Sequence, residues 1–134
     1  MHDIGVDTDS GYEYLYKGDF SESSGYDSIL YMIGHYSVQP TAIISANNTM
    51  CIGILKALYA QGLQVPEQYS VACFNGLENM ELYRVQPTVA DYSPSLFGQV
   101  AGRLALERIK NPLLENREQI IRPRIIPGNG VAMI

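Results

Sequence analysis

The residues best suited to binding chemistry are asparagines that come directly after apolar runs. Asn47 and Asn48 follow the run 42–46, and Asn75 follows the run 69–74. A side-chain amide both donates and accepts hydrogen bonds, which suits adjacent hydroxyl groups on a small polar ligand. Each position also has a structural explanation, because Asn48 is the better-placed helix N-cap and Asn75-Gly76 is a turn sequence.

Phe20 and Ser21 lie just before a predicted helix, and each of them admits a binding and a structural interpretation. An aromatic ring complements the C–H face of a sugar or a base, although a phenylalanine at a strand end can equally belong to the core. Ser21 can line the same opening as Phe20. Serine is also favoured as a helix N-cap, and this is the interpretation we prefer.

Motifs for catalysis are absent from the sequence. It contains no Gly-rich phosphate loop, no nucleophile elbow and no cluster of metal ligands. His35 stands without a carboxylate at catalytic spacing and receives no chemical role. Cys51 and Cys73 lie inside apolar runs, which predicts reduced core thiols, with a disulfide as the alternative. We therefore predict no catalytic residue, no metal and no cofactor.

A strand that turns directly into a helix positions the first pair of asparagines. After the apolar run, hydrophobic residues recur at helical spacing over 50–58, and Gly62 is placed to end that helix. Residues 69–74 form the next predicted core strand. Alternating strands and helices predict an α/β fold whose parallel sheet is flanked by helices on both faces. Because ligands collect at the carboxyl ends of parallel strands, Asn47 and Asn75 are expected to share one opening.

The other predicted elements complete this alternation. One helix, capped by Ser21, Ser23 or Ser24, runs to about His35 and presents an apolar face made of Tyr26, Ile29, Leu30 and Ile33. A later helix starts at Ser93-Pro94 and stops at Asn111-Pro112. The remaining predicted segments are a strand at 12–16, a loop with one helical turn at 77–85, a short strand or extended crossing at 88–92 and an edge strand at 119–126.

Size and charge limit the class of protein. The 134 residues suffice for one domain with a hydrophobic core, since 46% are hydrophobic and 17% are charged. The net charge of -5 and the pI near 4.9 argue against a nucleic-acid-binding surface on this chain. No apolar stretch reaches the ~20 residues of a membrane helix. The N-terminus lacks the basic start and apolar core of a signal peptide, which predicts a cytoplasmic protein.

A series of short motifs lies between about residues 17 and 127. They are Gly18-Asp19-Phe20-Ser21 followed by Ser24-Gly25-Tyr26, the run 40–48 with Met50 and Gly53, Gly62-Leu63-Gln64-Val65-Pro66, Ser70-Val71 with Phe74-Asn75, and Gly98 with Ala101. In this order and at this spacing, the motifs resemble the LacI/GalR family of bacterial transcription regulators.

The resemblance implies a periplasmic-binding-protein-like I fold, in which two α/β lobes clamp a small molecule that is usually a sugar. Residues 1–134 are expected to form the C-terminal effector-binding lobe, with the family's closing helix at about 94–110 and its final strand at about 119–127. The DNA-binding headpiece and most of the N-terminal lobe are expected to be absent. The implied function is that of a non-enzymatic fragment of a homodimeric regulator, which senses a sugar-like effector and contacts operator DNA only through the headpiece.

The resemblance also assigns the candidate ligand-binding residues, which are Asn47, Asn75, Phe20 and Ser21. The family places a sugar-binding asparagine at position 47 and an aromatic ring against the ligand at position 20. Asn75 and Asn48 stand where the family has aspartates. These replacements remove negative charge, so a phosphorylated or acidic effector is an alternative to a neutral sugar.

In the family, the helix that matches 94–110 packs on the other lobe. Its apolar face, formed here by Phe97, Val100, Ala101 and Leu104, is therefore expected to dock elsewhere or to be covered by a second copy of the chain. The helix 50–58 is a further candidate for a two-fold contact. With only half of the ligand contacts, the isolated chain is expected to bind its effector weakly or undetectably.

Two other functions remain open at this point. A solute-binding protein of a sugar transport system would use the same fold, and a signal sequence in the full gene would identify it. A small flavodoxin-like enzyme would need a phosphate loop or paired acids after its strands, and the sequence shows neither.

Overall fold

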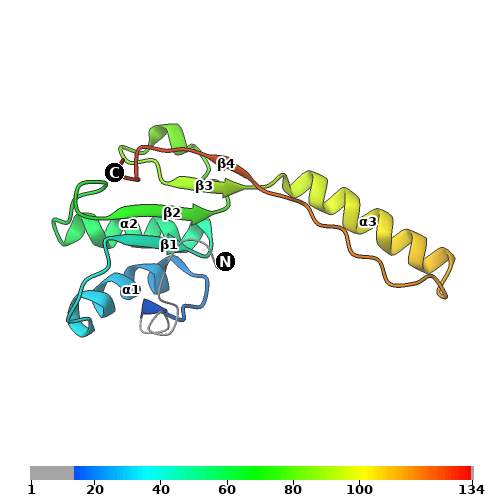
Figure 1. Ribbon diagram of the computed structural model, residues 1–134, viewed down its shortest axis with the longest axis horizontal. Helices are drawn as coiled ribbons and strands as arrows, with labels where there is room; N and C mark the ends of the chain where they lie inside the picture. The colour runs from blue at the N-terminus through cyan, green and yellow to red at the C-terminus, as the bar shows by residue number, and fades with distance from the viewer. Residues whose placement is uncertain (1–13, 134) are drawn as a thin grey trace.

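The computed structural model describes residues 14–133, in which a four-stranded sheet has the strand order β1-β2-β3-β4 (Figure 1). β1 (Ala42–Ser45), β2 (Ser70–Phe74) and β3 (Thr88–Asp91) run parallel, and β4 (Arg124–Ile126) pairs antiparallel with β3. The parallel sheet predicted from the sequence is therefore confirmed for β1, β2 and β3, and the prediction is wrong for β4. That strand returns from a helix that leads away from the sheet, so it reaches the edge in the opposite direction.

The first predicted strand, at residues 12–16, falls partly outside the described residues. Within its described part, residues 14–16 form no strand, so β1 is the edge of the sheet opposite β4. The loop 77–85 does contain one short helical turn, η2 (Met80–Leu82), as predicted.

Two helices, α1 (Glu22–His35) and α2 (Asn48–Ala60), pack against each other. Ser21 caps α1, because its Oγ accepts a hydrogen bond from the Ser24 N–H at 3.0 Å. Asn47 caps α2 through a 2.8 Å bond from the Met50 N–H to its Oδ1. The expectation that Asn48 is the N-cap is therefore wrong by one residue, since Asn48 already belongs to the helix.

The helix pair is held at close range by glycines. A Cβ at Gly25 would overlap the backbone of Met50, and a Cβ at Gly53 would overlap the backbone of Glu22. This close approach turns α1 so that Gly25, Ile29 and Met32 are its buried residues. The predicted apolar face was correct at Ile29 but wrong at Leu30 and Ile33, which are 42% and 41% exposed.

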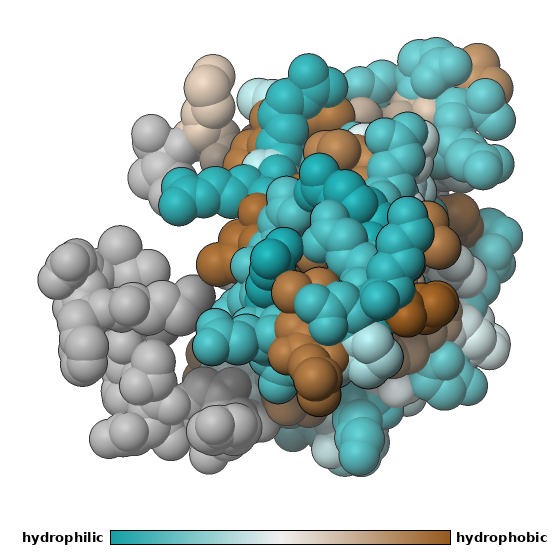
Figure 2. Space-filling view, turned by 90° about the vertical axis from the view of Figure 1, so that its right-hand side faces the viewer, coloured by the Kyte–Doolittle hydropathy of each residue, from teal (hydrophilic) through white to brown (hydrophobic). Residues whose placement is uncertain are grey.

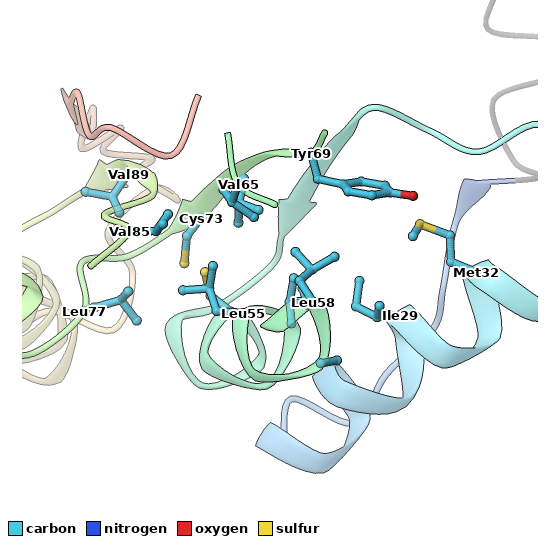
Figure 3. Close-up of a cluster of buried hydrophobic side chains, with 14 residues drawn as sticks. Ile29, Met32, Leu55, Leu58, Val65, Tyr69, Cys73, Leu77, Val85 and Val89 are labelled. Atoms are coloured by element: carbon cyan, nitrogen blue, oxygen red, sulfur yellow. The ribbon is translucent and has the colours of Figure 1, made fainter. Parts of the chain in front are cut away.

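The hydrophobic core lies between α1, α2 and one face of the sheet (Figure 3). Its fully buried members include Ile29 of α1, Leu58 of α2, Val71 of β2 and Val89 of β3. The opposite face of the sheet stays accessible, since Ile44 in β1 is 82% exposed. The expected helical cover on both faces is thus present on one face only in residues 14–133. Cys51 and Cys73 are free and buried in the core, as predicted.

A projecting arm is formed by α3 (Pro94–Lys110) and the segment 111–123 that returns beside it (Figure 1). Ser93 caps α3 by accepting a 3.2 Å hydrogen bond from the Leu96 N–H, and Pro94 begins the helix. No residue of α3 is buried, and Phe97 is 55% exposed. The alternative that this helix docks elsewhere on its own chain is therefore not realised in residues 14–133.

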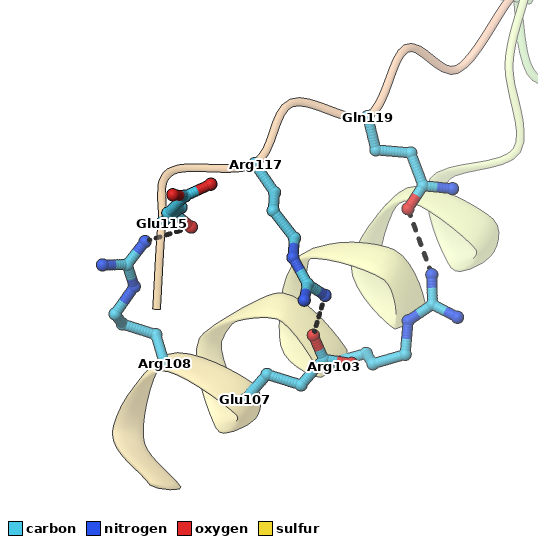
Figure 4. A network of polar contacts seen from close by, with 6 residues as sticks. All are labelled: Arg103, Glu107, Arg108, Glu115, Arg117 and Gln119. Atoms are coloured by element: carbon cyan, nitrogen blue, oxygen red, sulfur yellow. Dashed lines mark hydrogen bonds and ion pairs between the residues drawn. The ribbon is translucent and has the colours of Figure 1, made fainter. Parts of the chain in front are cut away.

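Polar contacts hold the two halves of the arm together (Figure 4). Arg103 donates to Gln119 Oε1 at 3.1 Å, and Arg117 forms an ion pair with Glu107 at 3.1 Å. Figure 2 views the molecule toward the end of this arm, where hydrophilic and hydrophobic side chains are intermixed on the surface. Among the described residues, no helix combines the length and the apolar character that crossing a bilayer requires.

Candidate ligand site at the strand ends

The carboxyl ends of β1 and β2 bring Asn47 and Asn75 to the same edge of the sheet. The parallel register pairs Ser45 with Cys73, so each asparagine lies two residues beyond one member of that pair. A hydrogen bond of 3.3 Å from Asn48 Nδ2 to the Gly76 carbonyl joins the start of α2 to the turn after β2. The sequence therefore predicted correctly that these residues share one edge, which is the place where open α/β sheets bind ligands.

Asn47 uses both ends of its side-chain amide within the chain. Its Oδ1 caps α2, and its Nδ2 donates to the Phe20 carbonyl at 3.0 Å. The amide therefore links the start of α2 to the segment before α1 through two hydrogen bonds. An amide nitrogen has two donors and an amide oxygen has two lone pairs, so one donor and one lone pair remain available to a ligand.

Phe20 is held in a strained and exposed position. Its φ of 67° lies in the left-handed region, which is unfavourable for a bulky side chain and costs on the order of 1–3 kcal/mol. The residue is 64% exposed, which excludes the alternative that Phe20 belongs to the core. An exposed ring that the chain holds at such a cost is a candidate for stacking on a ligand.

Asn75 also has a left-handed backbone, with a φ of 73°, and asparagine tolerates this region better than most residues. Its N–H donates to the Ala90 carbonyl at 3.0 Å, which fixes the turn against β3. Its Oδ1 is buried and has no hydrogen-bond partner among the described residues. A buried acceptor without a partner lowers the free energy of unfolding by ~1–3 kcal/mol. The side-chain amide at position 75 is therefore not explained by a contribution to stability.

Ser21 lies at the same edge but its hydroxyl is already engaged. It donates to Asp19 Oδ1, contacts Ser23 Oγ at 2.9 Å and caps α1 through the Ser24 N–H. The geometry therefore accounts for Ser21 as a helix cap, the interpretation preferred from the sequence. Its ligand role is a prediction with less geometric support than that of Phe20.

The structure adds carboxylates that the sequence analysis did not single out. Asp91 ends β3, and its Oδ1 accepts a 3.1 Å hydrogen bond from the Gly76 N–H. Asp19 precedes Phe20, and the hydroxyl and N–H of Ser21, together with the Ser24 hydroxyl, lower its pKa to about 2. Asp91 was missed because it was assigned to the interior of a strand. Its position at the end of a strand next to β2 was the signal that could have identified it.

Other hollows lie away from this edge. One, of about 210 Å³, runs along β1 and is lined by residues such as Leu15, Met32 and Ile43. Another, of about 460 Å³, lies beside the C-terminal end of α2 and is lined by residues such as Tyr59 and Arg84. Neither hollow includes Asn47 or Asn75. Within residues 14–133 no group of His, Cys, Asp and Glu side chains is arranged to hold a metal ion.

Comparison with known proteins places the chain among periplasmic binding protein-like domains. Residues 9–131 match the family described as a periplasmic binding protein-like domain. The HTH-type transcriptional repressor PurR of Salmonella typhi is 28% identical over 119 residues, and the ribose operon repressor of Escherichia coli is 27% identical over 124 residues. These matches cover 89% and 92% of the chain but only 35% and 36% of the two repressors. The chain therefore spans about a third of the length of these relatives.

Solved structures show the same fold. A LacI family transcriptional regulator from Enterococcus faecalis, solved with bound ribose, has a TM-score of 0.75 at 24% identity, and the match covers 88% of this chain and 43% of that one. The regulator CcpA of Lactococcus lactis has a TM-score of 0.76 at 17% identity, covering 87% and 42%. The chain therefore belongs to the periplasmic binding protein-like domain family.

Proposed function

We propose that this chain is the C-terminal ligand-sensing lobe of a transcriptional regulator, and that its effector is a sugar or a sugar derivative. The observation that carries the proposal is the shared edge at which Asn47 and Asn75 follow adjacent parallel strands. Phe20 adds an exposed ring, and its backbone carbonyl accepts a hydrogen bond from Asn47 Nδ2. Amides beside an aromatic face supply both kinds of contact that a sugar requires, namely hydrogen bonds to hydroxyls and packing on C–H groups.

The remaining half of the site belongs to a second lobe in this proposal. The arm formed by residues 94–123 is the segment that such a lobe would cover, and a helix-turn-helix headpiece would contact operator DNA. Ligand closure between lobes would shift the balance between two arrangements, because a ligand moves an equilibrium only through its differential affinity for the two states. The activity is regulatory and not enzymatic, which agrees with relatives that are repressors.

The proposal predicts where a sugar contacts the isolated chain. Ribose is the first probe, because a structural relative was solved with it. Half a site should bind with a dissociation constant of roughly a millimolar or weaker, since each lobe supplies only part of the contacts. Backbone amide chemical shifts, followed by NMR during a ribose titration, should change most at Phe20, Asn47 and Gly76.

Two outcomes of that titration would contradict the proposal. The first is the absence of any shift at these residues up to high ribose concentration. The second is a set of shifts centred on the hollow beside Tyr59 and Arg84. Micromolar affinity measured by calorimetry on the isolated chain would contradict the view that this lobe holds only half of the site.

A further inference from the structure

The end of β3 brings a carboxylate to the proposed ligand site. Phe74 pairs with Ala90 in the parallel register of β2 and β3, so Asp91 lies opposite Asn75. Asp91 Oδ1 accepts the Gly76 N–H, and within residues 14–133 its Oδ2 has no hydrogen-bond partner. The residue is only partly buried. One carboxylate oxygen is therefore fixed by the turn after β2, and the other remains available.

We infer that Asp91 supplies the negative charge of the ligand site and makes it selective for neutral, hydroxyl-rich ligands over phosphorylated ones. This inference rests on the proposed function of the site. The neutral Asn48 and Asn75 left a phosphorylated or acidic effector open as an alternative. The inference argues against that alternative, because Asp91 on the neighbouring strand supplies the negative charge that those two positions lack. A carboxylate accepts strongly from ligand hydroxyls and repels a phosphate.

The charges described around this edge agree with the inference. Asp19, which lies one residue before Phe20, adds a second carboxylate. The ion pairs among the described residues are Lys56 with Glu22 and Arg117 with Glu107, so neither Asp19 nor Asp91 is neutralised by a cation within residues 14–133. A phosphate at this edge would therefore meet uncompensated negative charge, whereas a hydroxyl would meet an available acceptor.

The test compares ribose with ribose 5-phosphate by NMR titration of the 134-residue chain. The wild-type chain should bind ribose more tightly than ribose 5-phosphate by roughly tenfold, a factor that lies between those expected for one short-range charge contact in water and at a protein surface. This comparison needs no variant. A phosphate derivative that binds as tightly as ribose, or more tightly, overturns the inference.

Asp91→Asn tests whether Asp91 causes the preference. The substitution removes the charge, while the amide oxygen can still accept the hydrogen bond from the Gly76 N–H. The variant should bind ribose several-fold more weakly, and its preference for ribose over ribose 5-phosphate should fall to the smaller part that Asp19 contributes. Glu67→Gln, which removes the same charge beside the hollow lined by Tyr59 and Arg84, is the control and should behave like the wild type. The inference is overturned if Asp91→Asn keeps the wild-type preference for ribose over ribose 5-phosphate, or if Glu67→Gln loses that preference equally. Neither result contradicts the proposed ligand site. If neither ligand shifts Phe20, Asn47 or Gly76, the proposed function itself is contradicted.

Discussion

Asn47 and Asn75 follow adjacent strands but differ in what their side chains do within the chain. Asn47 caps α2 and fixes the Phe20 carbonyl, so it is a structural residue as well as a candidate ligand contact. Asn75 holds its turn through its backbone, and its Oδ1 has no partner among the described residues. If substitution of Asn47 abolishes ligand binding, the loss can therefore come from a missing ligand contact or from lower stability of the fold. Asn75 is the residue whose substitution reports on recognition more directly.

Asn47→Ala is expected to lower the free energy of unfolding by ~1–3 kcal/mol, because it removes an N-cap and a second hydrogen bond. Asn47→Asp keeps an acceptor for the Met50 N–H and should be less destabilising, although it loses the donor to Phe20. Urea unfolding monitored by circular dichroism measures both changes. Thr49→Ala, at an exposed neighbouring position, is the control. Wild-type stability in Asn47→Ala would show that the two hydrogen bonds of the Asn47 side chain are not formed.

Asp19 gives a prediction about pH. Its pKa in the folded chain is about 2, whereas an unfolded aspartate titrates near 3.9, so the folded state favours the charged form. This contribution to stability is fully present above about pH 4 and is lost as the pH falls toward about 2. NMR titration of the Asp19 carboxyl group should show the low pKa. Ser21→Ala should return it toward the ordinary value, and an unchanged pKa in that variant would contradict the assigned cause.

At the scale of elements, the contact between α1 and α2 sets the geometry of the site. Gly25 and Gly53 allow the two backbones to touch, and this places the N-terminal end of α2 beside the segment that carries Phe20. The ion pair between Lys56 and Glu22 lies on the exposed side of the same contact and adds little stability, as is usual for exposed pairs. The glycines, and not the charges, therefore determine how closely the helices approach.

Gly25→Ala and Gly53→Ala should each destabilise the chain by ~1–3 kcal/mol or more, because the added methyl group meets backbone atoms that cannot move aside easily. Gly34→Ala is the matched control, since it lies in the same helix as Gly25 with open space around it. It should stabilise the chain by ~0.5–1 kcal/mol through helix propensity. Thermal unfolding of the three variants measures the contrast, and equal effects at Gly25 and Gly34 would contradict the close contact.

Within residues 14–133, the molecule consists of a body, whose core lies on one face of the sheet, and an arm on which no residue of α3 is buried. α3 has no buried residue, and its large apolar side chains include Leu106 at 59% and Ile109 at 73% exposure. Exposed apolar patches on this scale are typical of surfaces that another protein element covers. In the isolated chain a second copy is the available partner, whereas in a longer regulator the other lobe takes this role by our proposal.

The isolated chain is therefore expected to associate as its concentration rises. Leu106→Glu should weaken this association by placing a charge on the apolar surface of α3, and Gln99→Glu adds the same charge at an exposed position of lower hydrophobicity. Light scattering coupled to size-exclusion chromatography measures the mass of each variant. A wild-type chain that stays monomeric with α3 in solvent would rule out this behaviour.

The sequence predicted the parts of the fold that depend on local patterns. The cap at Ser21, the helix ends at Gly62 and Asn111, and the shared edge of Asn47 and Asn75 follow from capping, turn chemistry and strand alternation. The errors arose where tertiary contacts decide. The buried face of α1 depends on which helix Gly25 meets, and the direction of β4 depends on where the arm returns. Asp91 joins the site only through a strand register that spacing alone does not give.

The most direct test of the central claim is ligand binding by the full-length gene product with Asn75 intact or replaced. A panel of neutral sugars should yield an effector that raises the unfolding temperature, and calorimetry should show that Asn75→Ala weakens its binding by ~1–3 kcal/mol, because a hydrogen-bonding partner of the ligand is lost. Without ligand, the strain of an alanine at a φ of 73° opposes the gain from removing a buried unpaired acceptor, so the unfolding temperature of the variant should differ from that of the wild type by only a few degrees. Equal affinity in Asn75→Ala and wild type would contradict the claim that the ends of β1 and β2 form the ligand site.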